Sequence, residues 1–281
     1  MQKCLKILIR VLQIHIIKYG SGNKMTEKTD LIKNIRKQLA DGVVTIGTWQ
    51  QIPHASISEI LGQAGYDWVA VDMEHGSVSV AQLPDLFRAI ELGGTLPLAR
   101  IAESIPKDCK QALDAGAGGI IAPMIKSAEQ LTMVRNACCW PPVGTRGVGF
   151  SRANLFGKNF DSYKKEAQSP LLIAQIEHIN AVNNLEEILQ VDGLDAIIVG
   201  PYDLSASMGI TGKFDTREFI EVMNSIINRC KKYNVPCGDH VVHPDQQLLE
   251  KRIQQGYRFI AFGTDAVFLY KSSQMPDVSN K

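Results

Sequence analysis

Three ionisable residues cluster at the end of an apolar run near the start of the sequence. Residues 69–78 read VAVDMEHGSV and place Asp72, Glu74 and His75 within four positions. Burying such a group without a partner costs several kcal/mol or shifts its pKa until it is neutral, so the cluster indicates a site that uses it. Histidine titrates near neutral pH and Asp72 could fix the tautomer of His75, which makes the pair a candidate acid–base element. Taken alone, His75 is more simply a structural histidine.

Two further acids follow later apolar runs. Side chains alternate along a strand, so Gln175 and Glu177 in LLIAQIEH point to one face. Asp203, in GPYDLS, follows the next apolar run, and neighbouring parallel strands lie about 4.8 Å apart. Glu177 and Asp203 can therefore approach closely, where two carboxylates repel unless they share a proton or a cation. Oxygen ligands predict a Mg²⁺ or Mn²⁺ site. For Asp203 alone, hydrogen bonds to backbone amides of the turn are the alternative.

Arginines supply the candidate cations. Arg100, in LPLARI, is always charged, and its planar fork of donors suits a carboxylate or an enolate oxygen. An ion pair with an acid at the end of a neighbouring strand is the alternative. Arg146 and Arg152 lie in the glycine-rich stretch 144–156 and could present a cation to a distal carboxylate or phosphate of a substrate. Otherwise they are solvated.

A third set, Cys237, His240 and His243, has the spacing C-x₂-H-x₂-H of a zinc site. On a strand end followed by Pro244, this spacing does not give four convergent ligands. We therefore do not expect zinc there.

The elements that must position these residues follow a βα pattern, in which short apolar runs alternate with stretches of helical period. The predicted strands are Val43–Gly47, Trp68–Asp72, Leu96–Ile101, Gly118–Ala122, Leu171–Ile176, Ala196–Gly200, Val235–Gly238 and Phe259–Gly263. Eight strands with intervening helices predict an α/β fold, a (β/α)₈ TIM barrel, whose active site lies at the carboxyl ends of the strands. A doubly wound open sheet is the rival, but no strand–GxGxxG–helix opens the chain.

One stretch, Trp140–Ser169, interrupts this rhythm. Its GTRGVG segment follows Pro141 and Pro142 rather than a strand. We therefore interpret the GTRGVG segment as a mobile loop and not as a dinucleotide cradle.

The composition favours small-molecule chemistry. The 281 residues carry 30 Lys+Arg against 29 Asp+Glu, so no overall field attracts nucleic acid or an anionic membrane. The six cysteines form no CxxC pair, which favours a reducing, cytoplasmic location. Residues 1–24 are basic and apolar, but they make a weak signal peptide and too short a span for a membrane helix. We expect them to be a non-native or upstream extension, followed by a single domain over residues 25–281.

Six motifs, VDMEHG, PLAR, ALDAGAGGIIAPM, PPVGTRGVG, AQIE and VGPYDLSASMG, occur in this order between about Thr45 and Phe268. Together they resemble the metal-dependent (class II) hydroxyketoacid aldolases of the HpcH/HpaI family. The resemblance implies a (β/α)₈ barrel that assembles into a homohexamer, or trimer of dimers, with an exchanged C-terminal helix. It also implies a divalent cation, Mg²⁺, Mn²⁺ or Co²⁺, held by Glu177 and Asp203.

The resemblance further implies a reaction, the cleavage of a 4-hydroxy-2-oxo acid to pyruvate and an aldehyde. Arg100 would hold the 2-oxo oxygen, while His75, oriented by Asp72 and acting directly or through a water, would remove the 4-hydroxyl proton. Glu74 would support the site through a water, and Asp114 would reach the site of a neighbouring subunit. The remaining substrate-binding positions implied are Gln175, Gly200, Pro201 and Tyr202.

Departures from the family pattern affect the substrate rather than the reaction. Met73, His178 and Tyr202 each replace a small residue and change the bulk near the metal. No lysine stands at a predicted strand end, so a Schiff base is not expected. The alternatives are a carbon–carbon lyase acting on an acyl-CoA ester and a non-catalytic barrel that binds an oxo acid.

Overall fold

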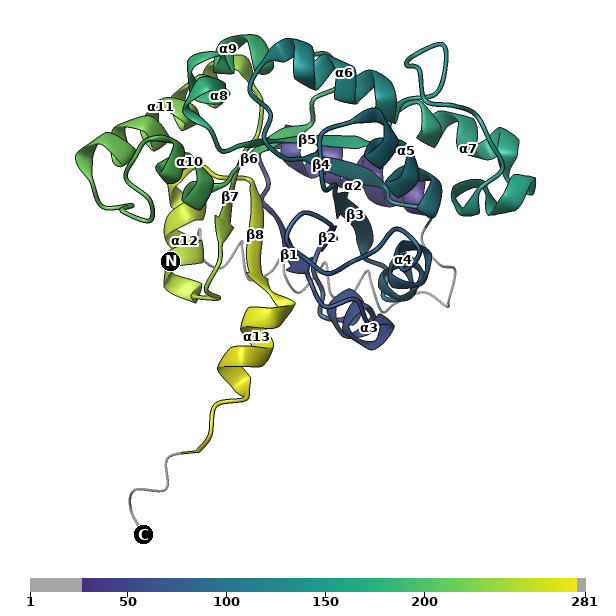
Figure 1. Ribbon diagram of the computed structural model, residues 1–281, viewed down its shortest axis with the longest axis horizontal. Helices are drawn as coiled ribbons and strands as arrows, with labels where there is room; N and C mark the ends of the chain where they lie inside the picture. The colour runs from purple at the N-terminus through teal and green to yellow at the C-terminus, as the bar shows by residue number, and fades with distance from the viewer. Residues whose placement is uncertain (1–26, 277–281) are drawn as a thin grey trace.

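Eight parallel strands close into a barrel in the computed structural model, which describes residues 27–276 (Figure 1). Each strand pairs with the next, and β1 pairs with β8, which confirms the predicted (β/α)₈ architecture. The expected upstream extension, residues 1–24, lies outside the described residues, and the domain boundaries stay a prediction. The strands are β1 (Thr45–Gln50), β2 (Trp68–Asp72), β3 (Leu96–Arg100), β4 (Gly119–Ala122), β5 (Leu171–Ile176), β6 (Ala196–Val199), β7 (Cys237–Val241) and β8 (Phe259–Thr264).

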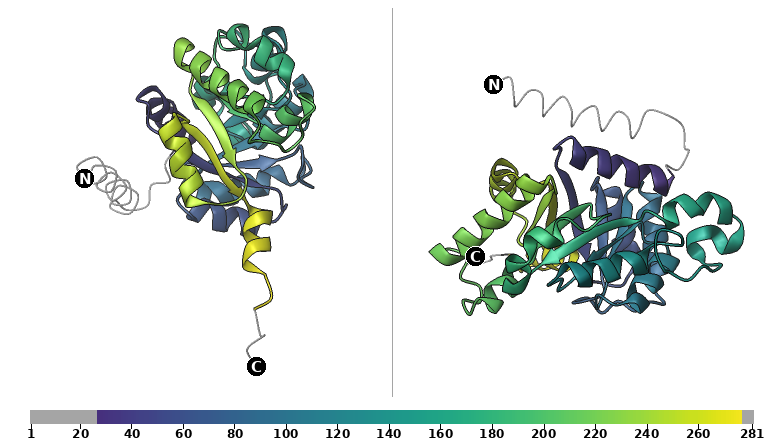
Figure 2. Two further views of the ribbon diagram at one scale, coloured as in Figure 1. Left: turned by 90° about the vertical axis from the view of Figure 1, so that its left-hand side faces the viewer. Right: turned by 90° about the horizontal axis from the view of Figure 1, so that it is seen from above.

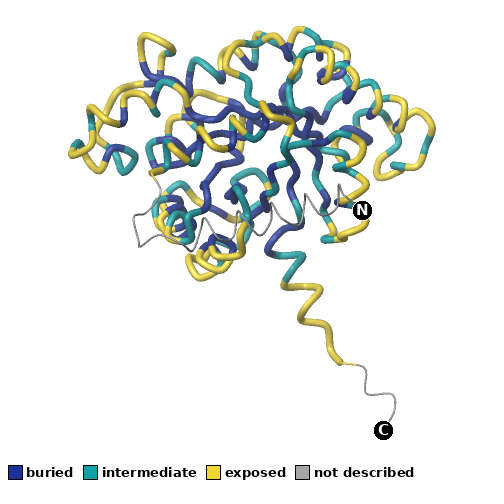
Figure 3. The backbone as a smooth tube through the Cα atoms, turned by 180° about the vertical axis from the view of Figure 1, so that it is seen from behind, coloured by how far each residue is buried: buried dark blue, intermediate teal, exposed yellow. Residues whose placement is uncertain are grey.

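Helices surround the barrel (Figures 1 and 2). They are α2 (Lys28–Ala40), α3 (Ala55–Gln63), α4 (Leu83–Leu92), α5 (Pro106–Ala115), α6 (Ala128–Cys138), α7 (Phe160–Ala167), α8 (Ile179–Asn183), α9 (Leu185–Ile188), α10 (Pro201–Ser207), α11 (Arg217–Tyr233), α12 (Gln246–Gln255) and α13 (Asp265–Ser272), with the 3₁₀-helix η1 at Arg152–Gly157. None of the helices in residues 27–276 is long and apolar enough to cross a membrane. Most of them bury one face against the strands, and α13 instead projects away from the barrel (Figure 3).

Alternation of side chains along the strands divides the apolar core into two layers. The inner layer fills the barrel, where the rings of Trp68 and Phe259 stack with centroids 4.3 Å apart. A Cβ on Gly47 would lie 2.0 Å from the ring of Trp68, so only glycine fits beside it. The outer layer lies between the strands and the surrounding helices. Polar residues at inward positions must therefore lie at an open end of the barrel.

Helix α2 covers the amino-terminal end of the barrel. Its buried residues Ile32, Ile35 and Leu39 belong to the same apolar cluster as Trp68 and Leu96, the first residues of β2 and β3. The carboxyl end is left as the mouth, as in barrel enzymes generally.

The long loop predicted at residues 140–169 is wrong in its second half, which folds into η1 and α7, whereas residues 140–151, with the GTRGVG segment, contain no helix or strand. Trp140, Tyr163 and Ala167 form a separate small core under it. We call residues 140–169 the insertion. Its aromatic residues supply enough apolar surface to order a long connection between β4 and β5.

Two strands extend further than predicted. β1 runs to Gln50 rather than ending at Gly47, and β7 runs to Val241 rather than ending at Gly238. Glycine usually marks a turn, but here it lies inside a strand. A Cβ on Gly238 would lie 2.4 Å from the backbone oxygen of Phe259, so a close approach of strands requires the glycine.

Candidate active site

A buried ion pair between β2 and β3 forms the centre of the mouth. Asp72 and Arg100 are register partners, and the guanidinium donates from Nε to Oδ1 at 2.9 Å and from Nη2 to Oδ2 at 2.6 Å. Burial opposes ionisation of Asp72, but Arg100 outweighs it and lowers the pKa of the carboxyl. The guanidinium also lies over the ring of Trp49, 4.4 Å from its centroid. Arg100 is thus fixed in one orientation.

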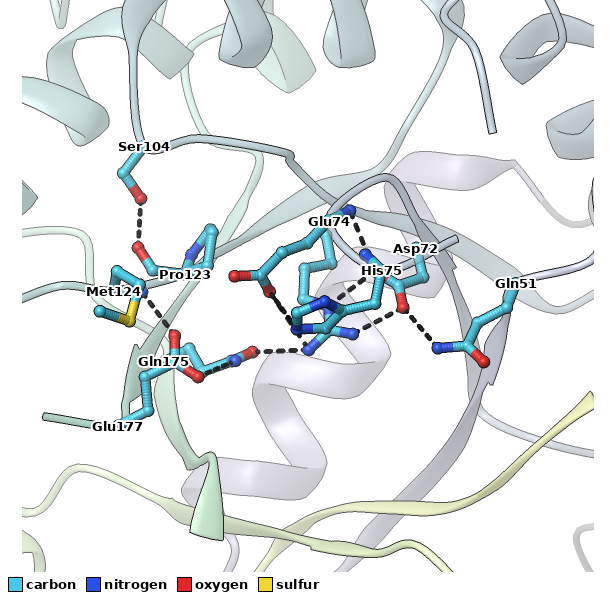
Figure 4. Close-up of polar contacts among 10 residues, drawn as sticks. Gln51, Asp72, Glu74, His75, Ser104, Pro123, Met124, Gln175 and Glu177 are labelled. Atoms are coloured by element: carbon cyan, nitrogen blue, oxygen red, sulfur yellow. Dashed lines mark hydrogen bonds and ion pairs between the residues drawn. The ribbon is translucent and has the colours of Figure 1, made fainter. Parts of the chain in front are cut away.

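The predicted contact between Asp72 and the ring of His75 is absent. The Asp72 carboxylate instead accepts hydrogen bonds from the side chain of Gln51 at 2.9 Å and from the backbone N–H groups of Glu74 and His75. Arg100 occupies the same two oxygens, because it lies directly opposite Asp72 in the register of β2 and β3. Asp72 therefore orients Arg100 and the turn after β2, rather than the imidazole (Figure 4).

Glu74 is the acid nearest the imidazole. Its Oε2 lies 3.8 Å from Nε2 of His75 and 3.4 Å from Nη1 of Arg100, without a hydrogen bond among the described residues. Burial raises the pKa of Glu74 to about 7, against the effect of Arg100 and with the help of the negative charges of Glu177 and other carboxylates. The side chain of His75 is 56% exposed. The two groups thus form a carboxyl–imidazole pair at the rim.

A second chain of contacts joins Arg100 to β5. Gln175 accepts from Nη1 of Arg100 at 3.5 Å, and its Nε2 donates to Oε2 of Glu177. The other oxygen of Glu177 accepts from the backbone N–H of Met124 at 2.6 Å. Met124 has a left-handed backbone (φ +53°), and such strain is often found where a site must aim a group. Inward residues of β2, β3 and β5 are thereby connected (Figure 4).

Asp203 lies beside this chain, in the first turn of α10. Burial raises the pKa of Glu177, and the charge of Asp203 raises it further, so the two carboxylates interact electrostatically. Gly200 precedes α10, and a Cβ there would lie 2.5 Å from Oε2 of Glu177. Glycine therefore keeps the space beside this carboxylate open.

These residues fit a divalent cation. Asp72, Glu74 and Glu177 interact with the single guanidinium of Arg100, and the charge of Asp203 acts on Glu74, which leaves an excess of negative charge. Within residues 27–276, no group of three or more histidine, cysteine or acidic side chains is arranged to hold a metal. Glu177 and Asp203 would therefore supply two oxygen ligands and leave the others to substrate and water, a pattern typical of Mg²⁺.

A cavity of about 390 Å³ adjoins the mouth. Tyr202, which is 48% exposed, lines it and meets Phe214 edge-on, with ring centroids 5.0 Å apart. Pro201 lines it as well. The ring of His178 caps α8 by accepting from the backbone of Asn180 at 3.1 Å, so this residue has a structural role besides its bulk.

The arginines of the insertion do not present free cations. Arg146 is buried and donates to the hydroxyl of Tyr163 at 3.0 Å, and Arg152 pairs with Glu91. Both predicted alternatives, a contact to a distal anion and a solvated side chain, are therefore wrong for this chain taken alone. Local spacing in the sequence does not indicate that aromatic residues surround Arg146.

Other predicted residues are separated by the fold. Cys237 belongs to the outer apolar layer and His240 faces the ring of Trp49 inside the barrel, so the C-x₂-H-x₂-H set does not converge. Asp114 lies on α5, where Arg146 and Lys110 interact with it, and it does not reach the mouth of its own barrel. Sequence reasoning missed Trp49, Gln51 and Met124, and it placed His240 beyond the strand. Gly47 and Gly238 lie inside β1 and β7 instead of ending them, so continuing each strand past its glycine would have included Trp49 and His240.

Comparison with known proteins identifies the family. Residues 45–271 match the HpcH/HpaI aldolase/citrate lyase family. The chain is 36% identical to 2-dehydro-3,6-dideoxy-6-sulfogluconate aldolase of Pseudomonas putida, over 82% of this chain and 90% of that protein. It is 34% identical to 4-hydroxy-2-oxovalerate aldolase of Novosphingobium aromaticivorans, over 86% of this chain and 92% of that protein.

A solved structure agrees with these matches. An HpcH/HpaI aldolase/citrate lyase family protein from Burkholderia cenocepacia J2315 superimposes with a TM-score of 0.80 at 29% identity, covering 85% of this chain and 96% of that one. The sequence-based prediction of an aldehyde-lyase is confirmed. The chain belongs to the HpcH/HpaI aldolase/citrate lyase family.

Proposed function

We propose that the protein cleaves a 4-hydroxy-2-oxo acid to pyruvate and an aldehyde, with a divalent cation held by Glu177 and Asp203. The observation that carries this proposal is the continuous chain from Asp72 through Arg100 and Gln175 to Glu177. It places a fixed guanidinium and a buried carboxylate around one space. Such an arrangement suits a 2-oxo acid, whose adjacent oxygens become more negative as an enolate forms.

Arg100 stabilises the negative charge that develops on the 2-oxo oxygen. Its Nε and Nη2 are bound to Asp72, so Nη1, near Glu74 and Gln175, is the donor left for substrate. Because the ion pair fixes the guanidinium beforehand, little reorganisation is needed during the reaction. A bound cation would act as a Lewis acid on the same oxygen. Gly200 leaves room beside Glu177 for the substrate.

His75 and Glu74 form the acid–base element. A base removes the proton of the 4-hydroxyl, the C3–C4 bond breaks, and its electron pair forms the enolate of pyruvate while the aldehyde leaves. A proton delivered to C3 then yields pyruvate. We assign the base to His75, with Glu74 in place of Asp72 as the acid beside its ring, since Oε2 of Glu74 lies 3.8 Å from Nε2.

A coupled assay of pyruvate release from a panel of 4-hydroxy-2-oxo acids tests the proposal. We expect chelator to abolish activity and added Mg²⁺, Mn²⁺ or Co²⁺ to restore it. Glu177→Gln should lower kcat/KM by about 10³-fold, because the cation loses a charged ligand. Glu218→Gln, on the exposed face of α11, is the matched control. Pyruvate release that chelator and Glu177→Gln both leave intact would contradict the metal assignment.

A homohexameric assembly with exchanged α13 is part of the proposal. It is supported by Leu269 and Tyr270 of α13, which are 57% and 68% exposed in the single chain. Asp114 would then act toward a neighbouring subunit, which is consistent with its distance from its own mouth. Light scattering of the purified protein measures the mass, and a monomer would contradict the exchange. The cytoplasmic location likewise stays a prediction.

A further inference from the structure

His240 occupies a position in the mouth for which the proposed reaction has no use. It lies on β7, with its ring against that of Trp49 at a centroid distance of 5.7 Å. Arg100 lies over the same indole ring at 4.4 Å. The strand alternation that turns Asp239 outward to Arg252 on α12 turns His240 inward. His240 is therefore an inward residue at the level of the ion pair.

The two nitrogens of the His240 ring have different environments. The ring donates a hydrogen bond to the backbone carbonyl of Gly263, while Nε2 is buried without a partner among the described residues. Nδ1 is thus the nitrogen that carries the proton, and Nε2 presents a lone pair. Leaving a buried acceptor unsatisfied costs about 1–3 kcal/mol, so its presence calls for an explanation.

His240 is suited to accept a hydrogen bond rather than to remove a proton. Burial, with the nearby charge of Arg100, lowers the pKa of His240 to about 3. A catalytic base works best with a pKa near the pH of the reaction, so this imidazole is a poor base near neutrality. The imidazole remains neutral, and its acceptor nitrogen can accept a hydrogen bond from a hydroxyl group.

The position of His240 indicates which part of a substrate it meets. β6 lies between β5 and β7, and Gly200, which follows β6, stands at this level, so no side chain at that position separates Glu177 from His240. His240 also lines the 390 Å³ cavity together with Pro201 and Tyr202, which immediately precede Asp203. A substrate whose oxo-acid end lies at Glu177 and Arg100 would extend its other end toward His240.

We propose that His240 is a specificity-determining residue, whose Nε2 accepts a hydrogen bond from a hydroxyl group on the fragment released as the aldehyde. This inference rests on the proposed function and narrows its substrate class. The preferred substrates are 4-hydroxy-2-oxo acids whose aldehyde half carries a further hydroxyl group. A site built to bind a hydroxyl group discriminates strongly against the analogue that lacks it.

The test uses the reaction in the direction of synthesis, from pyruvate and two matched aldehydes, lactaldehyde and propanal. We expect wild type to prefer lactaldehyde, and His240→Leu to lower the ratio of the two kcat/KM values by about 10- to 100-fold. His240→Gln should restore part of the ratio, because its amide oxygen can accept the same hydrogen bond. Gln247→Leu, at an exposed position of α12 outside this cavity, is the control and should leave the ratio unchanged.

Exchange of the C3 protons of pyruvate with deuterated solvent is measured alongside, because it reports enolate formation without an aldehyde. A wild type that exchanges these protons but shows the same ratio as His240→Leu would overturn the His240 proposal alone. An equal fall for both aldehydes would also overturn it, since a merely structural role acts in that way. A wild type that neither exchanges these protons nor joins pyruvate to an aldehyde would overturn the proposed function and this inference with it.

Discussion

The mouth and the insertion each contain a buried arginine on an aromatic ring, yet only one is equipped for chemistry. Arg100 lies 4.4 Å from the centroid of Trp49, and Arg146 lies 5.7 Å from that of Trp140. Arg100 binds Asp72 with two hydrogen bonds and lies 3.4 Å from Glu74. The only hydrogen bond of the Arg146 guanidinium among the described residues is the one to Tyr163.

The difference shows what distinguishes a site from a core. Two parallel strands in register bring Asp72 opposite Arg100, so the barrel fixes the charge and its partner together. The insertion surrounds Arg146 with aromatic residues, and the guanidinium mainly fills space under α7. A buried cation with carboxylates on one side and an open mouth on the other can act on a substrate. A buried cation enclosed by rings stabilises a fold.

The largest expected effect separates the two arginines. Arg100→Met should lower kcat/KM by about 10³-fold, because it removes a preorganised positive charge from the developing enolate. Arg146→Met should change kcat/KM by less than about threefold and lower the free energy of unfolding by about 1–3 kcal/mol, because it leaves the buried hydroxyl of Tyr163 and the carboxyl of Asp114 without their cation. Pyruvate release and urea unfolding measure the two quantities.

Circular dichroism must show that Arg100→Met is folded, since the variant leaves Asp72 buried without its partner. Arg100→Lys, which retains the charge but not the planar fork, should recover only part of the activity. Comparable losses of activity in Arg100→Met and Arg146→Met would break the distinction between the two regions.

A second expected effect is on stability and depends on pH. The folded-state pKa of Asp72 is lowered, so its ionised form contributes stability above its unfolded pKa of about 3.9, and the contribution is lost as the pH falls through the lower folded value. Asp72→Asn should therefore reduce the free energy of unfolding by about 3–5 kcal/mol at pH 7. The difference from wild type should shrink below about pH 4.

The insertion supplies the control for this measurement. Asp161 pairs with Lys164 at 2.7 Å, but their side chains are 89% and 53% exposed, and exposed pairs contribute about 0–1 kcal/mol. Asp161→Asn should show little difference from wild type at any pH. Urea unfolding between pH 3 and 7 measures all three proteins, and a pH-independent loss in Asp72→Asn would mean that the ion pair is not its cause.

The sequence was sufficient for elements whose boundaries are marked locally. The limits of β2 and β5 agree with the prediction, because polar residues end both strands. The predicted limits of β1 and β7 were wrong, because their glycines are required by close contact with neighbouring strands and not by a turn. The acids and the arginine of the mouth were found because their types are unusual after apolar runs.

The partners within the mouth could not be inferred in the same way. Asp72 and Arg100 are 28 residues apart, and their contact depends on the register of two strands. Spacing alone favoured His75 as the partner of Asp72, since the two lie three positions apart. Which ring nitrogen of His240 carries the proton depends on the backbone carbonyl of Gly263, which lies on another strand. Local pattern thus identified most of the groups, and tertiary structure decided which of them act together.

The smallest expected effect concerns backbone strain, which both regions contain. Met124 in the mouth and Leu155 and Phe156 in the insertion have left-handed backbones, with φ of +53°, +49° and +55°. Met124 donates its N–H to Glu177, whereas Phe156 is 69% exposed and does not touch the mouth residues. Strain at Met124 thus has a use within the site, and strain at Phe156 has none within this chain.

Asparagine tolerates the left-handed region better than phenylalanine. Phe156→Asn should therefore raise the free energy of unfolding by about 0.5–1 kcal/mol without changing kcat/KM. Val148→Asn, at an exposed position of the insertion with an ordinary backbone, is the control and should give no gain. Urea unfolding measures both variants. A loss of stability in Phe156→Asn, accompanied by a fall in the mass measured by light scattering, would instead mean that Phe156 is buried between copies of the chain and that its strain serves assembly.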